Sequence, residues 1–139
     1  MIPNFSNSKI LIIGDVMLDK YYFGSVERIS PEAPVPIVNI SKEESRLGGA
    51  ANVANNIASL GGQTLLCGVI GHDFLGKEVE RITRQKNIRT ILLRTLSPTI
   101  TKARIIGGKQ QIVRVDYADK SEPKNDDFRS LKEAIFTHL

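Results

Sequence analysis

Short apolar runs alternate with amphipathic segments through the first part of the chain. Residues 9–14 form a short continuous apolar run that is rich in β-branched residues and closed by glycine, which is typical of a strand buried on both faces of a parallel sheet. Residues 64–70 and 88–93 are further apolar runs of strand length, and residues 50–60 and 74–86 carry apolar side chains at helical spacing. The expected inward residues are Ala50, Val53, Ala54, Ile57 and Leu60 in the first helix, and Leu75, Val79 and Ile82 in the second. This order of strands and helices predicts an α/β fold, a parallel sheet with flanking helices.

Two other segments predict β structure outside that sheet. Residues 21–40 are rich in aromatic and β-branched residues and contain Pro34 and Pro36, which exclude a helix and suit an edge strand or ribbon. We therefore predict a flap at residues 21–40. Residues 100–106 and 110–115 flank a Gly-Gly-Lys turn and predict a hairpin.

The end of the chain predicts one more helix. A polar linker at residues 118–127 contains Asp126, whose side chain can cap a helix. The apolar residues expected to share one face of that helix are Phe128, Leu131, Ile135 and Leu139. At 139 residues and 41% apolar content, all of these elements fit one domain.

Composition argues against several kinds of site. The first apolar run, residues 10–13, is short and no basic segment precedes it, so we expect no secretory signal, no membrane span and a cytoplasmic location. Cys67 is the single cysteine and the two histidines are far apart, which predicts no disulfide and no metal site. The sequence contains neither a P-loop nor a Gly-x-Gly-x-x-Gly dinucleotide fingerprint.

Positive charge is concentrated in one segment. Between Gly76 and Lys109 the chain has nine basic and two acidic residues, whereas the net charge of the whole chain is +4. Such a segment attracts nucleic acid or a phosphorylated metabolite, unless it is only a solvated face. Because no aromatic residue interleaves with these cations, nucleic acid is the less expected partner.

Polar residues and glycines follow the predicted strands, at the sheet edge where parallel sheets bind ligands. Asp15 and Asp19 come after the first strand, and carboxylates can accept hydroxyls of a polyol, although either residue could simply cap a turn. Gly48 and Gly49 precede the first helix and leave room for a ligand beside the backbone, and Asn52 offers a donor and an acceptor. The pattern predicts a polyol site.

Two further groups could carry chemistry. Asp73 lies between a strand end and a helix start, where we expect it to cap the helix, and His72 is expected to be a loop residue. Lys102 and Arg104 occupy alternate positions of the predicted hairpin, so their side chains point the same way. They could hold a phosphate or line an exposed ribbon face.

Together these motifs resemble the PfkB, or ribokinase-like, carbohydrate kinases. The run Gly48-Gly49-Ala-Ala-Asn52-Val-Ala54, followed by Leu60-Gly61, is similar to the first signature of the family, and Gly71-His72-Asp73-Phe74-Leu75-Gly76 to another N-terminal landmark. Residues 14–19, 28–38, 101–104 and 110–116 look like the heptose kinase branch of the family. That branch phosphorylates D-glycero-β-D-manno-heptose 7-phosphate at O1 for lipopolysaccharide core synthesis.

The resemblance implies a ribokinase-like fold in which residues 21–40 form a small β lid. It implies a sugar phosphate substrate, a homodimer formed through the lid, and ATP and Mg²⁺ as cofactors of the full-length enzyme. The implied substrate-binding residues are Asp15, Asp19, Gly48, Gly49, Asn52, Lys102 and Arg104.

The second signature of the family, Asp-Thr-x-Gly-Ala-Gly-Asp, has no counterpart in this sequence. In the family its final aspartate is the catalytic base and its glycines form an anion hole, which phosphoryl transfer requires. The resemblance therefore implies a single partial domain over residues 1–139, an N-terminal half that binds sugar but has no catalytic residue and holds no cofactor alone. The alternative is a non-catalytic α/β module that binds an acidic partner or nucleic acid through its basic segment.

Overall fold

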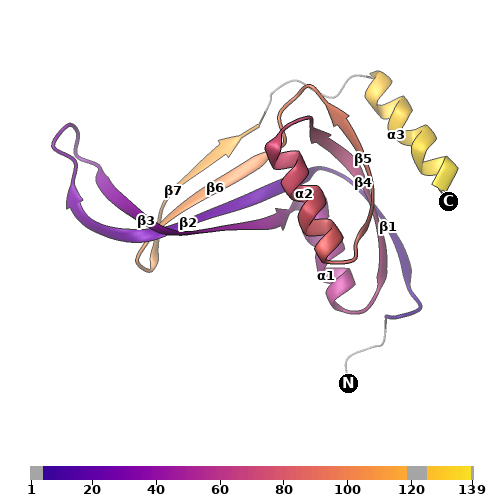
Figure 1. Ribbon diagram of the computed structural model, residues 1–139, viewed down its shortest axis with the longest axis horizontal. Coiled ribbons are helices and arrows are strands. Elements are labelled where there is room, and N and C mark those ends of the chain that lie inside the picture. Colours follow the sequence, from indigo (N-terminus) through magenta and orange to yellow (C-terminus); the bar gives the residue numbers. More distant parts are fainter. Residues whose placement is uncertain (1–4, 119–124, 139) are drawn as a thin grey trace.

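The computed structural model describes residues 5–118 and 125–138 and contains two sheets (Figure 1). The first is parallel, in the order β1-β4-β5, and consists of β1 (Lys9–Ile13), β4 (Gln63–Gly71) and β5 (Arg89–Thr95). Helix α1 (Gly49–Ser59) leads into β4 and helix α2 (Phe74–Gln85) leads into β5. The predicted α/β fold with a parallel sheet and flanking helices is confirmed.

Successive side chains of β4 point to opposite faces of the parallel sheet and belong to two separate hydrophobic clusters. Leu66 and Ile70 belong to a cluster that includes Val79 of α2 and small residues of α1. Cys67, one position along from Leu66, packs instead with residues of α3 (Asn125–His138). Because successive residues of a strand point to opposite faces, α1 and α2 cover one face of the parallel sheet and α3 the other.

Helix α1 buries a different stripe from the predicted one. Ala51 and Ala54 are fully buried, whereas Val53 and Leu60 are 49% and 51% exposed. The prediction that Val53 and Leu60 face the core was wrong, because the helix packs through alanines, whose small side chains let its backbone approach the sheet closely. The larger residues are left at its sides.

Helix α3 agrees with its predicted face in part. Leu131 and Ile135 are buried, whereas Phe128, which the sequence placed on the same face, is 55% exposed. Asp126 lies inside the helix, which begins at Asn125, rather than preceding it as an N-cap. Leu139 lies outside the described residues.

The second sheet extends away from the first as a long ribbon (Figure 1). Its strand order is β3-β2-β6-β7, and we call it the lid sheet. The strands are β2 (Val16–Ile29), β3 (Pro36–Gly48), β6 (Thr101–Gly107) and β7 (Gln110–Tyr117). Strand β2 pairs antiparallel with β3 and parallel with β6, and β6 and β7 form an antiparallel hairpin.

The lid sheet is larger than the flap predicted at residues 21–40. A β ribbon outside the main sheet is present, but it runs from Val16 to Gly48 and includes the predicted hairpin. Pro36 begins β3, which agrees with the expected effect of the prolines on this segment. Among the described residues, no helix combines the length and apolar character needed to cross a bilayer.

Candidate functional site

One face of the lid sheet gathers polar side chains at its root, near the parallel sheet. In the strand register, Asp19 of β2 lies opposite Arg46 of β3 and Lys102 of β6, and the next residue on the same face of β2, Tyr21, lies opposite Glu44 and Arg104. Paired residues of neighbouring strands share a face. We call this the polar face of the lid sheet, and its members are Asp19, Tyr21, Glu44, Arg46, Lys102 and Arg104.

The opposite face at the same level belongs to the core. Leu18, between Met17 and Asp19, is completely buried and packs in the cluster that contains α1 and α2 residues. Asp19 lies inside β2, so the alternative that it simply caps a turn was wrong. The burial of Leu18 directs the neighbouring Asp19 to the polar face.

Asp19 and Arg104 form a partly buried ion pair. The Arg104 Nη1 atom donates to Asp19 Oδ1 at 2.6 Å, and the two side chains are 21% and 19% exposed, respectively. The hydrogen bond with Asp19 raises the pKa of Arg104 above its ordinary value. The second carboxylate oxygen, Oδ2, lies so close to Gly48 that a Cβ built on Gly48 would meet it at 2.8 Å.

Tyr21 holds two guanidinium groups over its ring. The Cζ atoms of Arg46 and Arg104 lie 4.6 Å and 5.2 Å from the ring centroid, which is the range of a cation–π interaction. Arg46 also pairs with Glu44 at 2.6 Å. Sequence reasoning missed Tyr21 and Arg46 as site residues. Tyr21 could have been found from the sequence, because it follows Asp19 by two positions, which is the spacing of residues on one face of a strand.

The turn before α1 brings Asp15 to the two glycines. Gly49 has a φ of +54°, and the carbonyl oxygen of Asp15 accepts a hydrogen bond from the Ala50 N–H group at 2.9 Å. It is thus the backbone of Asp15, and not its exposed carboxylate, that supports the start of the helix. Gly48 is the N-cap of α1 and makes no side-chain capping bond.

The structure brings four of the predicted site residues together. Asp19, Gly48, Lys102 and Arg104 meet at the root of the lid sheet, as shown by the register and the contacts above. Asn52 lies in the first turn of α1 with an exposed side chain. Within the described part of the chain Lys102 makes no ion pair, so its charge is available to a ligand. The sugar contacts of all of these residues stay a prediction.

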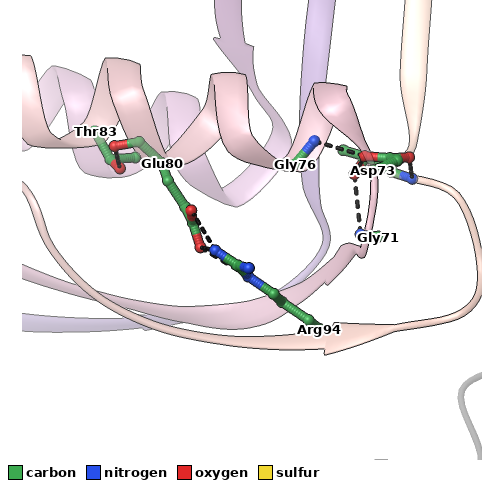
Figure 2. Close-up of polar contacts among 7 residues, drawn as sticks. Gly71, Asp73, Gly76, Glu80, Thr83 and Arg94 are labelled. Atoms are coloured by element: carbon green, nitrogen blue, oxygen red, sulfur yellow. Dashed lines mark hydrogen bonds and ion pairs between the residues drawn. The ribbon is translucent and has the colours of Figure 1, made fainter.

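Asp73 caps α2, as the sequence predicted, and makes further bonds (Figure 2). Its Oδ1 atom accepts from the Gly76 N–H group at 2.7 Å, and its two carboxylate oxygens accept from the hydroxyl and the backbone N–H of Thr99 at 2.7 and 2.8 Å. Burial raises the pKa of Asp73, but the hydrogen bonds from Thr99 and Gly76 outweigh it and leave the pKa below its ordinary value. His72 is exposed, as expected of a loop residue.

Ion pairs occupy part of the basic segment. Arg81 pairs with Glu78 on α2, and Arg94 of β5 forms a two-pronged pair with Glu80 of α2 (Figure 2). With Arg104 held by Asp19, three of the nine cations are neutralised in ion pairs and lie on three different elements. This distribution weakens the alternative of one continuous basic surface for nucleic acid.

Comparison with known proteins finds relatives along almost the whole chain. The family described as pfkB family carbohydrate kinase matches residues 7–139. The chain is 50% identical over 119 residues to a D-beta-D-heptose 7-phosphate kinase of Bordetella bronchiseptica, a match that covers 85% of this chain and 38% of that protein. It is 46% identical over 134 residues to a bifunctional protein HldE of a Shewanella species, covering 96% of this chain and 28% of that protein. The chain thus spans well under half the length of these relatives.

Solved structures share the fold at low sequence identity. A carbohydrate kinase from Agrobacterium tumefaciens superposes with a TM-score of 0.67 at 21% identity, covering 92% of this chain and 42% of that one. Phosphofructokinase-2 from Escherichia coli in complex with fructose-6-phosphate gives a TM-score of 0.69 at 19% identity, covering 94% and 41%. These likenesses confirm the predicted ribokinase-like fold of the described elements.

Proposed function

The chain belongs to the pfkB family of carbohydrate kinases, and we propose that it forms the sugar-binding part of a heptose kinase. The proposed substrate is D-glycero-β-D-manno-heptose 7-phosphate, phosphorylated at O1 in lipopolysaccharide core synthesis in the cytoplasm. The relative from Bordetella bronchiseptica, at 50% identity, is named D-beta-D-heptose 7-phosphate kinase, which supports this choice of substrate. The observation that carries the proposal is the meeting of Asp19, Gly48, Lys102 and Arg104 at the root of the lid sheet.

The chemistry of these residues suits a phosphorylated polyol. One carboxylate oxygen of Asp19 binds Arg104, and its other oxygen, which lies beside Gly48, can accept a sugar hydroxyl. Asp15, Gly49 and Asn52 would complete the sugar side, at the turn before α1 and in its first turn.

The phosphate side of the substrate needs cations. Lys102 is unpaired among the described residues, and Arg104 has further N–H groups beyond the one that binds Asp19. Hydrogen bonds from cations to a phosphate are charge-assisted and roughly twice as strong as neutral ones. We propose that Lys102 and Arg104 hold the 7-phosphate.

Turnover requires more than these residues. Among residues 5–118 and 125–138, no three His, Cys, Asp or Glu side chains gather at a point that could hold a metal ion. We propose that Mg²⁺, ATP and the catalytic base belong to the part of the longer relatives that this chain does not match. The chain alone should bind sugar phosphate without phosphorylating it.

The lid sheet also offers a surface for a second copy of the chain. Val26, Ile40, Ile112 and Val113 are apolar and exposed on its strands. Exposed apolar patches of this kind mark interaction surfaces. We propose a homodimer formed through the lid sheet, which sedimentation of the purified chain would test.

Isothermal titration of the purified chain with heptose 7-phosphate tests the proposed function. We expect saturable binding, with weaker binding of the same heptose without phosphate. Lys102→Ala should lower the affinity about tenfold, the loss of one charge-assisted hydrogen bond. Asp19→Asn should also weaken binding of both sugars.

Lys109→Ala is the matched control, because Lys109 is an exposed cation in the turn between β6 and β7. It should bind like the unmodified chain. No binding of heptose 7-phosphate by the unmodified chain up to millimolar concentration would refute the proposal. Tight binding of random DNA that falls steeply with salt would support the nucleic-acid alternative instead.

A further inference from the structure

A buried hydrogen-bonded junction connects the parallel sheet to the lid sheet. Thr99, 2% exposed, lies in the connection between β5 and β6, and its hydroxyl and its backbone N–H group both bind Asp73 at the start of α2. The Thr99 hydroxyl donates to Asp73 Oδ1 at 2.7 Å and accepts from the Gly71 N–H group at 2.9 Å. We call Gly71, Asp73, Gly76 and Thr99 the lid junction.

The lid junction leaves no space for rearrangement. A Cβ built on Gly71 would lie 2.5 Å from the backbone nitrogen of Thr99, and one on Gly76 would lie 2.4 Å from the carbonyl oxygen of Gly71. These distances are far below van der Waals contact. The glycines therefore let the end of β4, the start of α2 and the connection before β6 approach more closely than a residue with a Cβ would allow.

The junction lies directly before the strand that carries the phosphate-binding candidates. The carbonyl oxygen of Ile100, next to Thr99, accepts from the Leu18 N–H group of β2 at 2.9 Å, and Thr101 then pairs with Leu18 in the parallel register. Lys102 follows opposite Asp19. A slip of one residue between β6 and β2 would turn every side chain of β6 to the other face.

We propose that Asp73 and Thr99 are positioning residues for the phosphate side of the site. By anchoring the residue that precedes β6, they fix the register of β6 against β2, so that Lys102 and Arg104 share a face with Asp19. Neither Asp73 nor Thr99 touches the substrate. The inference rests on the proposed function for its ligand, but the protection of the hydrogen bonds of β6 can be measured without one.

Thr99→Val tests the inference, because it keeps the volume of the side chain and removes the hydroxyl that joins Asp73 to Gly71. Thr83→Val is the matched control, since Thr83 is also buried, at 1% exposed, and its hydroxyl donates only to the Glu80 carbonyl within α2. Thr99→Ser restores the hydroxyl. Circular dichroism establishes that each variant is folded before binding is measured.

We expect Thr99→Val to weaken heptose 7-phosphate binding at least about fivefold while changing the affinity for unphosphorylated heptose less than twofold. Thr99→Ser and Thr83→Val should each remain within twofold of the unmodified chain. Equal losses in Thr99→Val and Thr83→Val, or equal losses for both sugars, would overturn the positioning role, because they would indicate a general loss of structure.

Hydrogen exchange separates this inference from the proposed function. In Thr99→Val without ligand, amides of β6 should exchange faster, and those of β1 should not. Unchanged exchange in β6 would refute the inference even if the chain binds heptose 7-phosphate. If the unmodified chain binds no sugar phosphate, the proposed function fails. Faster exchange of the β6 amides in Thr99→Val would still support the control of register by the lid junction.

Discussion

Gly49 is a residue at which one added methyl group should affect the candidate site sharply. Its φ of +54° lies in the left-handed region, and a Cβ built there would come within 2.4 Å of the Asp15 carbonyl oxygen. The same oxygen accepts the hydrogen bond from Ala50 that ties the start of α1 to the turn after β1. Gly49→Ala therefore strains the backbone and also forces that contact apart.

The structure contains a glycine that separates these two effects. Gly108, in the turn between β6 and β7, has a φ of +61° and no atom within 4 Å of a Cβ built on it. Gly108→Ala lowers stability only through the backbone strain of the left-handed conformation, about 1–2 kcal/mol. Lower entropy of the unfolded chain offsets about 0.4–1 kcal/mol of that strain in both variants. Gly49→Ala should lose in addition about 0.5–1.5 kcal/mol for the disturbed hydrogen bond to Asp15.

Urea unfolding followed by far-ultraviolet circular dichroism measures both variants against the unmodified chain. We expect Gly49→Ala to lower the free energy of unfolding by about 1 kcal/mol more than Gly108→Ala, at the same slope in urea. Equal losses would refute the reasoning. They would mean that the Asp15 carbonyl moves aside without cost and that φ alone determines the effect.

Three further outcomes are expected. Gly48→Ala should weaken heptose 7-phosphate binding and also lower stability, because its Cβ would meet the Asp19 carboxylate and the Met17 Cγ atom, each at 2.8 Å; unchanged affinity in titration would contradict the placement of Asp19. Leu66→Ala should lower the free energy of unfolding by about 2–5 kcal/mol, while Leu96→Ala, at a 100% exposed position, should leave it within about 0.5 kcal/mol in urea unfolding. The pKa of Asp73 in the folded chain is below its ordinary value of 3.8. The ionised carboxylate therefore stabilises the fold above pH 3.8, and this stabilisation is lost as the pH falls through the lower pKa of the folded state. The stability difference between the unmodified chain and Asp73→Asn should be present at neutral pH and shrink in acid, and a difference independent of pH would contradict it.

Local patterns predicted the parallel sheet because each of its elements has a self-contained signal. The apolar run in β1 and the helical spacing in α2 can be recognised within a dozen residues. In α1 the same method selected Val53 and Leu60 for the core, whereas Ala51 and Ala54 are the fully buried residues. Periodicity cannot tell how closely a helix approaches a sheet, and that distance decides whether a small or a large side chain is buried.

Local sequence patterns predicted the lid sheet only in part. Prolines and aromatic residues predicted a ribbon, but they could not show that β2 begins at Val16 or that β6 pairs parallel to it. The pairing depends on hydrogen bonds between segments far apart in the chain. For the same reason Tyr21 and Arg46 were missed, since their role is visible only when β2 and β3 are in register.

By itself the sequence determined the order of the elements, the glycines at the turn before α1, and the carboxylates and cations available for a sugar phosphate. Tertiary structure alone decided which of them meet. Asp19 and Arg104 are 85 residues apart in the chain and 2.6 Å apart in the fold. The physical reason is register: side chains alternate along a strand, so which of them share a face is settled by how distant strands align, which no local pattern contains.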